Sequence, residues 1–265
     1  MSQVDPADIP VVILAGGKGT RIREASEALP KPMIDVGGKP IVWHIMKTYA
    51  HHGHRKFVLL LGFKSWTIKE YFLRYRENVS DFTINLSNSE TTFHGDYGGE
   101  NFEISMVYTG LDTLTGGRLS RARAHLEDAP AFMLTYGDGV ADIDVAAQRA
   151  HHFAEGTIGT VTAVHPTSRY GELQTDGHKV MDFAEKPDLN TGVVNGGFFM
   201  FSPGIFDYVN DDSEMLESGA LQALTKDGEL TMFLHEGFWR GMDTYREYVE
   251  LNTLWDSGEA PWRVW

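Results

Sequence analysis

The chain contains no cysteine, and this absence removes several kinds of chemistry. Without thiols it has no disulfide, no thiolate nucleophile and no cysteine-ligated zinc. Long hydrophobic runs are missing as well, because no apolar stretch approaches the ~20 residues that a membrane span needs. The first residues, MSQVDPADIP, are acidic and polar, which is not typical of a signal peptide. Together these absences predict a cytoplasmic protein that does not bind membranes.

Positive charge is also scarce. The 23 Lys+Arg are outnumbered by 37 Asp+Glu, which gives a formal net charge of −14. Nucleic acids and anionic membranes are bound through clustered cations, so we expect neither as a partner. A phosphate ligand must instead be held by a local group of Lys, Arg and backbone N–H groups. The length of 265 residues and the 42% hydrophobic content are ordinary for one α/β domain.

Apolar runs alternate with amphipathic segments through the first 165 residues. Buried strands are expected at 11–15, 57–61 and 131–136, further strands at 83–86, 102–108 and 159–164, and helices at 40–49, 66–75 and 144–155. This alternation predicts an α/β fold with helices on both faces of a mostly parallel central sheet. Functional loops then lie at the carboxyl ends of the strands. Later residues have short β segments, expected at 172–175, 180–185 and 197–201, before a closing strand, loop and helix.

The most specific motif follows the first expected strand. It reads Leu14-Ala15-Gly16-Gly17-Lys18-Gly19-Thr20-Arg21, and Lys31-Pro32 comes shortly after it. Glycines after a strand let backbone N–H groups approach phosphates closely, and Arg21 and Lys31 add positive charge. The spacing is not that of a Walker loop, because Gly19 separates Lys18 from Thr20. It is not a dinucleotide fingerprint either, because no acid follows the next strand.

This signature resembles that of the sugar nucleotidyltransferases, the nucleoside-diphosphate-sugar pyrophosphorylases. The similarity covers almost the whole chain. Its further motifs are Gly37-Gly38-Lys39-Pro40-Ile41, Thr115-Gly116-Gly117-Arg118, Tyr136-Gly137-Asp138-Gly139, Glu185-Lys186-Pro187, Asn195-Gly196-Gly197-Phe198 and Phe238-Trp239-x-x-Met242-Asp243-Thr244. The set is most similar to members that transfer a cytidylyl group to glucose 1-phosphate.

The resemblance implies a Rossmann-like, GT-A-like fold, a Mg²⁺ cofactor and a homo-oligomer. It also implies that CTP and glucose 1-phosphate give CDP-glucose and pyrophosphate. The attacking sugar-phosphate oxygen is already an anion, so the protein has to align two polyanions and neutralise charge rather than supply a base. We expect one domain over 1–265, with a nucleotide-binding part at 10–165, a sugar-binding part at 166–245 and a C-terminal helix and tail at 246–265.

The same resemblance places the nucleotide and the catalytic groups. Arg21 is expected to grip the departing phosphates, and Lys31 to stabilise the α-phosphate; Asp138 is the third residue expected in the catalytic set. Arg118 has only donors, and aimed at O2 and N3 of the base it would favour cytosine over uracil. The alternative for Arg118 is a solvent-exposed arginine at the start of a helix. The residues expected to bind the nucleotide are Leu14, Ala15, Gly16, Gly17, Gly19, Thr20, Arg21, Lys31, Thr115, Gly116, Gly117, Arg118 and Gly137.

The metal and the sugar phosphate are placed in the same way. Asp138 and Asp243 are expected to bind Mg²⁺, which prefers carboxylate oxygens. The alternative is that Asp138 caps a turn and that Asp243 caps the helix near Thr244. Lys186 is expected to face the sugar phosphate, and Glu185 to accept hydrogen bonds from the hexose hydroxyls. The full sugar-phosphate set is Tyr170, Gly171, Glu185, Lys186, Asn195 and Trp239.

Other readings stay open. Leu29 stands where cytidylyl members often carry a lysine, as in uridylyl and thymidylyl relatives, so those two nucleotides are alternatives. A non-catalytic, sugar-nucleotide-binding regulatory subunit is another, although Lys31, Asp138 and Asp243 are all present. The histidines at 51–54 and at 151–152 are expected to lie on the surface. The tryptophans of the tail indicate either a contact surface or a segment packed on its own core.

Overall fold

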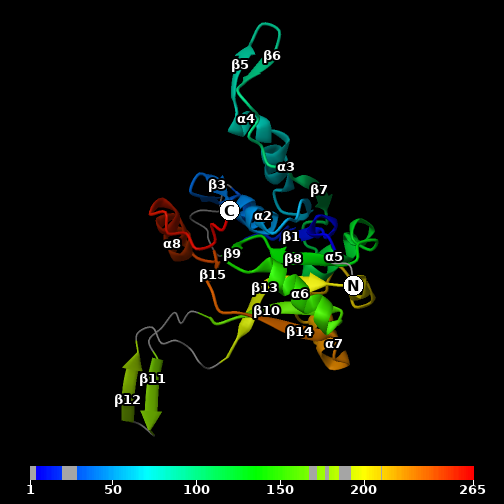
Figure 1. The fold of residues 1–265 in the computed structure, drawn as a ribbon, viewed down its shortest axis with the longest axis vertical. Coiled ribbons are helices and arrows are strands. Elements are labelled where there is room, and N and C mark those ends of the chain that lie inside the picture. The colour runs from blue at the N-terminus through cyan, green and yellow to red at the C-terminus, as the bar shows by residue number, and fades with distance from the viewer. Residues whose placement is uncertain (1–3, 20–28, 167–171, 177–178, 185–191, 210) are drawn as a thin grey trace.

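The fold is described from a computed structural model in which residues 4–19, 29–166, 172–176, 179–184, 192–209 and 211–265 are described. Its centre is a seven-stranded sheet in the order β14-β10-β13-β8-β1-β4-β7 (Figure 1). All neighbours are parallel except at β13, which is antiparallel to both β8 and β10. The prediction of a mostly parallel sheet is therefore confirmed. The strands are β1 (Val11–Ala15), β4 (Lys56–Leu61), β7 (Glu103–Tyr108), β8 (Phe132–Tyr136), β10 (Gly159–Val164), β13 (Val194–Phe201) and β14 (Leu230–His235).

Helices cover both faces of this sheet, which explains why β1 is apolar at every position. Successive side chains of a strand point to opposite faces. Val11 and Ile13 belong to the core that contains α2 (Ile41–His51), α6 (Val145–Glu155) and α8 (Tyr245–Asp256). Val12 and Leu14 belong to the core that contains α5 (Thr115–Arg121) and α7 (Ala220–Asp227). A strand whose two faces are both buried has apolar residues at successive positions, with no alternation of apolar and polar residues.

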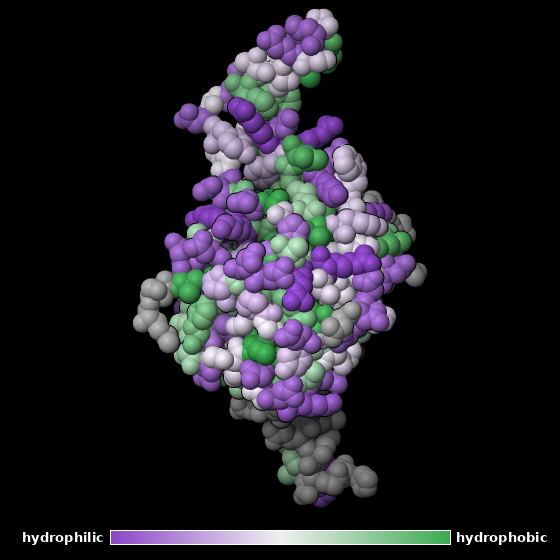
Figure 2. Space-filling view, turned by 90° about the vertical axis from the view of Figure 1, so that its right-hand side faces the viewer, coloured by the Kyte–Doolittle hydropathy of each residue, from purple (hydrophilic) through white to green (hydrophobic). Residues whose placement is uncertain are grey.

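An arm and a second hairpin project from opposite ends of the body (Figure 1). The arm is formed by α3 (Ser65–Leu73), α4 (Tyr75–Val79), β5 (Asp81–Asn85) and β6 (Glu90–His94), and the other hairpin by β11 (Glu172–Asp176) and β12 (Lys179–Ala184). Large apolar side chains are exposed on the arm, and Figure 2 shows hydrophobic residues along it; they are Trp66, Leu73, Phe82, Ile84 and Leu86. None of the described helices is long and apolar enough to cross a membrane.

Short elements connect the sheet to the loops at its edge. They are η1 (Pro6–Asp8), η2 (Lys31–Met33), β2 (Asp35–Val36), β3 (Lys39–Pro40), η3 (Arg123–His125), β9 (Gly139–Ala141), η4 (Pro203–Asp207) and β15 (Trp239–Gly241). The two strands β9 and β15 pair with each other outside the main sheet. They matter for function because β9 directly follows Asp138 and β15 ends two residues before Asp243.

The tryptophans of the tail pack on the protein's own core. Trp262 is fully buried and stacks against Trp255 and Phe238. Its indole N–H donates to Nδ1 of His44 in α2, at 3.3 Å. Of the two expectations for the tail, the structure shows the second, a segment that closes the core beside α2.

Candidate active site

The loops after β1 and β8 meet at one edge of the sheet because these strands are parallel neighbours. Leu14 is in register with Tyr136, and Gly137 N donates to Leu14 O at 3.1 Å. A side chain on Gly137 would bring its Cβ to 2.8 Å from that same oxygen, so only glycine allows this approach. The close approach places Asp138 beside the glycine loop that begins at Gly16.

The pairing of β9 with β15 brings in the second carboxylate. Gly139 is in register with Gly241, and Met242 N donates to Asp138 O at 2.8 Å. The helix α8 that follows is capped by Thr244 and Glu247, whose side chains bond each other's backbone N–H groups in a capping box. The alternative in which Asp243 caps this helix is therefore wrong. With the cap supplied by Thr244, the Asp243 carboxylate is directed toward Lys31 instead.

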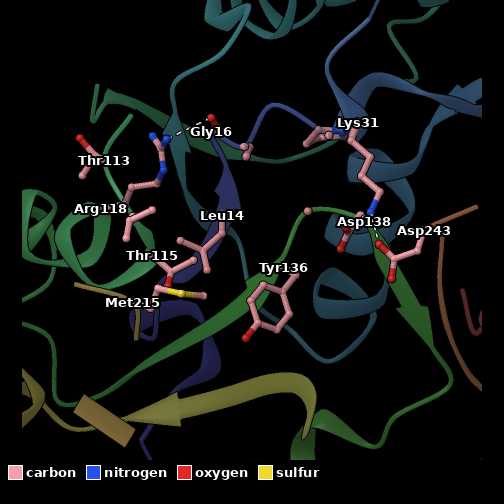
Figure 3. A pocket seen from close by; sticks show the side chains of 16 residues that line it. Leu14, Gly16, Lys31, Thr113, Thr115, Arg118, Tyr136, Asp138, Met215 and Asp243 are labelled. Carbon is pink, nitrogen blue, oxygen red and sulfur yellow. Dashed lines mark hydrogen bonds and ion pairs between the residues drawn. The ribbon is translucent and has the colours of Figure 1, made fainter. Parts of the chain in front are cut away.

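Lys31 lies between the two carboxylates. Its Nζ contacts Asp138 Oδ2 and lies 2.7 Å from Asp243 Oδ1, as Figure 3 shows. The side chain starts from η2, and the residue is only 8% exposed. Burial opposes the charge, but the two aspartates outweigh it and raise the pKa of Lys31 above its usual value. The ammonium is thus held charged at a buried position.

This cluster lies at one side of a cavity of about 430 Å³. The structure places many of the predicted nucleotide-site residues around it: Leu14, Ala15, Gly16, Gly17, Gly19, Lys31, Thr115, Arg118 and Gly137. Asp138 and Asp243, predicted as the metal pair, line it as well. The sequence analysis missed the other lining residues, Pro32, Thr113, Leu114, Tyr136 and Met215. Tyr136 and Pro32 stood inside recognised motifs, but Met215 belongs to a segment without any motif. Tyr136, Leu14 and Met215 lie near one another in Figure 3.

Arg118 is buried beneath the glycine loop. It is 4% exposed, so the alternative of a solvent-exposed arginine is wrong. Its terminal nitrogens donate to Gly16 O at 3.1 Å, to Thr109 Oγ1 at 2.7 Å and to Gly110 O at 2.8 Å (Figure 3 shows the bond to Gly16). A Cβ on Gly16 would lie 2.2 Å from Nη1 of Arg118. The guanidinium therefore ties the glycine loop to the segment that follows β7.

The N–H groups of Gly116 and Gly117 have protein partners. Both donate to Glu214 O, at 3.0 and 3.4 Å. A Cβ on Gly117 would lie 2.4 Å from the Cα of Asp212. These glycines allow the 211–214 segment to pack on α5. In this structure their N–H groups are consequently not available to a base, which differs from the expected role of Gly116 and Gly117 in nucleotide binding.

Glu217 bonds two residues of the cavity wall, and the sequence analysis did not identify it. It accepts hydrogen bonds from the hydroxyls of Tyr136 and of Thr115, the latter at 2.9 Å. Asn195 Nδ2 also lies 3.4 Å from the Tyr136 hydroxyl. Burial and the charge of Glu217 raise the pKa of Tyr136. The tyrosine therefore stays protonated and serves as a hydrogen-bonding group of the cavity wall.

The predicted sugar-phosphate residues are placed only in part. Tyr170, Gly171, Glu185 and Lys186 lie outside the described residues, as do Thr20 and Arg21. Trp239 in β15 donates from Nε1 to Gly196 O at 2.7 Å, and Asn195 Oδ1 accepts from Gly197 N at 2.8 Å. Neither side chain lines the cavity itself. Asn195 contacts the hydroxyl of Tyr136, which lines the cavity.

Comparison with known proteins agrees with this geometry. The family model described as "Nucleotidyl transferase" matches residues 10–257. The chain is 43% identical to the glucose-1-phosphate cytidylyltransferase of Salmonella typhi over 254 residues, 96% of this chain and 98% of that protein. It is also 43% identical to a probable glucose-1-phosphate cytidylyltransferase of Bacillus subtilis over 255 residues, 96% of this chain and 99% of that protein.

Solved structures share the fold at low sequence identity. HddC from Yersinia pseudotuberculosis, complexed with GMP-PN, matches with a TM-score of 0.66 and 23% identity, over 93% of this chain and 99% of that one. A UDP-glucose pyrophosphorylase complexed with UDP-glucose matches with a TM-score of 0.65 and 14% identity, over 94% and 99%. These likenesses support the GT-A-like architecture.

Proposed function

Because the chain belongs to the nucleotidyl transferase family, we propose that it transfers a cytidylyl group from CTP to α-D-glucose 1-phosphate, giving CDP-glucose and pyrophosphate. The observation that carries this proposal is the Lys31, Asp138 and Asp243 cluster at the edge of a glycine-lined cavity. The choice of CTP and glucose 1-phosphate follows the names of the relatives that are 43% identical over 96% of the chain.

The reaction needs alignment and charge compensation. A phosphate oxygen of the sugar attacks the α-phosphorus of CTP, the α–β phosphoanhydride bond breaks, and pyrophosphate leaves with the bonding electrons. Gly16, Gly17 and Gly19 line the cavity where backbone N–H groups can hold phosphates. Lys31 supplies a buried positive charge for the α-phosphate, where charge develops in the transition state. No general base is required, because the sugar phosphate is already ionised.

We propose Mg²⁺ as the cofactor, bound by Asp138 and Asp243. The residues fit this ion, because the two carboxylates already converge on one cation, the Lys31 ammonium. Among the described residues no group of three or more potential metal ligands occurs, so triphosphate oxygens and water have to complete the coordination. When bound, Mg²⁺ neutralises charge on the phosphate oxygens.

The glucose 1-phosphate is proposed to bind on the β13 and β15 side of the cavity. Asn195 is close to Tyr136, and Trp239 lies in β15, the strand that ends just before Asp243. Lys186 would anchor the sugar phosphate, with Glu185, Tyr170 and Gly171 around the hexose. In-line displacement requires the sugar phosphate to approach the α-phosphate from the side opposite to the departing pyrophosphate.

The proposal is tested by pyrophosphate release over a panel of CTP, UTP, dTTP, ATP and GTP, each with glucose 1-phosphate and Mg²⁺. We expect CTP to give the highest kcat/KM. Preference for UTP or dTTP would assign the chain to one of the alternative nucleotides on the same fold. Absence of release with all five would contradict catalysis and support the non-catalytic regulatory subunit. The Lys31→Ala variant serves as the blank.

We also propose that the protein is a homo-oligomer. The projecting arm supports this, because Leu73 and Leu86 on it are 69% and 85% exposed. Exposed apolar groups of this size are typical of contact surfaces. Light scattering on the purified protein should give a multiple of 29.6 kDa, and a monomer mass would contradict the proposal.

A further inference from the structure

The Lys31 ammonium lies where the proposed metal ion would have to bind. It contacts Asp138 Oδ2 and lies 2.7 Å from Asp243 Oδ1, and these are the two carboxylates proposed as metal ligands. The side chains of Asp138 and Asp243 keep 30% and 35% of their surface exposed, so the pair can be reached from the cavity. The chain therefore places a cation of its own against both carboxylates and compensates part of their charge.

A divalent ion and this ammonium cannot share the position. Mg²⁺ and Mn²⁺ need carboxylate oxygens at close to ~2.1 Å. Here one oxygen of each carboxylate contacts the ammonium. At such separations two cations repel each other strongly, above all in a site that is mostly shielded from water. Metal binding thus requires the Lys31 ammonium to move away.

Lys31 is able to move without unfolding its surroundings. Its backbone is fixed in η2, where Ile34 N donates to Lys31 O at 3.1 Å. The ammonium sits at the end of a flexible four-carbon stem, and the residue lines the cavity proposed for the nucleotide. A triphosphate in that cavity offers the ammonium a new anionic partner and offers the metal further oxygen ligands. Nucleotide binding can therefore draw the Lys31 ammonium away from the two carboxylates and let the divalent ion bind there instead.

We propose that Lys31 is the resident cation of the Asp138–Asp243 pair in the free protein, so that the divalent ion enters with the nucleotide and not before it. This inference rests on the proposed function for the identity of the nucleotide. Its core statement concerns only the free protein: Lys31 competes with divalent metal for the two carboxylates.

The test measures Mn²⁺ binding to the free protein, without nucleotide or sugar, by the electron paramagnetic resonance signal of unbound Mn²⁺. Lys31→Met should bind Mn²⁺ roughly tenfold or more tightly than the unmodified chain, a typical size for coupling between competing ligands. The matched control is Lys47→Met, which removes another lysine paired with a carboxylate, at 3.0 Å from Glu100. Both variants change the net charge equally, so the control should bind Mn²⁺ like the parent.

A double variant locates the effect. In Lys31→Met combined with Asp138→Asn the tighter binding should be lost, because only one of the two carboxylates is left to bind the ion. Equal Mn²⁺ affinity in Lys31→Met and in the parent overturns the inference, and so does tighter binding that survives Asp138→Asn. If Lys31→Met does not fold, as judged by circular dichroism, Lys31→Gln takes its place with the same expected result.

The outcome is separable from that of the proposed function. Tighter Mn²⁺ binding by Lys31→Met together with no CTP-dependent pyrophosphate release from the parent would leave the Lys31 inference standing and remove the cytidylyl transfer. Unchanged Mn²⁺ binding together with normal release would do the opposite.

Discussion

Lys31 and His44 are two buried basic side chains close together in the sequence, and the structure treats them in opposite ways. Lys31 is 8% exposed at the edge of the cavity, and His44 is fully buried in α2 beneath the tryptophans of the tail. The pKa of Lys31 is raised, while burial lowers the pKa of His44 to about 4. The first group is therefore a cation at neutral pH and the second is not.

Their partners account for the difference. Lys31 contacts two carboxylates, which stabilise its charge more than burial opposes it. His44 Nε2 bonds to Val36 O at 2.8 Å, and its Nδ1 accepts from the Trp262 indole. A proton on Nδ1 would face that indole N–H, so the arrangement holds only the neutral ring. A buried basic side chain thus stays charged where its partners are carboxylates. It stays neutral and packs in the core where its partners are uncharged polar groups.

The largest expected effect is the loss of the buried charge. Lys31→Ala should lower kcat by ~10²–10³, because one preorganised charge donor at a transition state is worth that much. The measurement is pyrophosphate release at saturating CTP and glucose 1-phosphate, with circular dichroism to show that the fold is retained. Near-normal turnover in the folded variant would remove Lys31 from catalysis and leave it a purely structural cation.

The carboxylates come next. Asp138→Asn and Asp243→Asn should each lower turnover by roughly 10- to 100-fold and raise the Mg²⁺ concentration needed for half-maximal rate, because each removes an anionic oxygen ligand. The exposed Asp128→Asn is the matched control and should behave like the parent. A lowered melting temperature with unchanged Mg²⁺ dependence would make the two residues structural partners of Lys31 only.

His44 tests the other side of the comparison through stability. Its pKa is lower in the folded than in the unfolded chain, so its contribution is present above pH ~6.5 and is lost as the pH falls toward 4. Between pH 7 and pH 5 this amounts to about 2 kcal/mol of unfolding free energy. His44→Gln, which keeps a donor and an acceptor, should reduce the fall measured by urea unfolding by that amount.

The control for His44 is the exposed His51→Gln, which should leave the pH dependence as in the parent. His54 and His152 are buried with pKa values lowered to about 4 by burial, so part of the parent's pH dependence remains in His44→Gln. An identical pH dependence in His44→Gln and the parent would mean that His44 is not held neutral by the tail.

Arg118 gives the smallest expected effect and sharpens the comparison with a third buried basic group. Its pKa is lowered by burial and by Arg121, and its hydrogen-bond partners are carbonyls and a hydroxyl rather than carboxylates. Arg118→Lys loses the fork that ties Gly16 to Gly110, and kcat/KM should fall about tenfold for CTP and UTP alike. The exposed Arg123→Lys is the control. A selective loss for CTP would instead support the base reading predicted from the sequence.

The sequence predicted the sheet and most of the cavity because local patterns determine both. β1 is apolar on both faces, and glycines after such a strand typically allow a close approach to the backbone, so the strand and the glycine loop could be predicted from the sequence. Arg118 was harder to interpret, because its partners Thr109 and Gly110 come from another strand end. Spacing along the chain does not reveal whether a donor faces a ligand or the protein's own carbonyls.

Long-range pairing explains the remaining differences. Met215 lines the cavity although it belongs to a segment with no motif, and only the folded chain brings Glu217 of the same segment to Thr115. The histidines at 54 and 152 were expected on the surface, but this is wrong, since His54 bonds to Ile9 O and His152 to Thr160. Buried polar residues whose partners lie elsewhere in the sequence carry no periodic signal.

The transfer step itself is the central claim, and the fate of the α-phosphate tests it most directly. The protein is incubated with glucose 1-phosphate, Mg²⁺ and CTP labelled with ³²P at the α-phosphate, and the products are separated by chromatography. The account predicts that the label is recovered with the hexose in CDP-glucose, while the pyrophosphate is unlabelled, and that Lys31→Ala forms both products ~10²–10³-fold more slowly. Label recovered in CMP without the sugar would contradict it, because the pocket would then hydrolyse the nucleotide rather than transfer it.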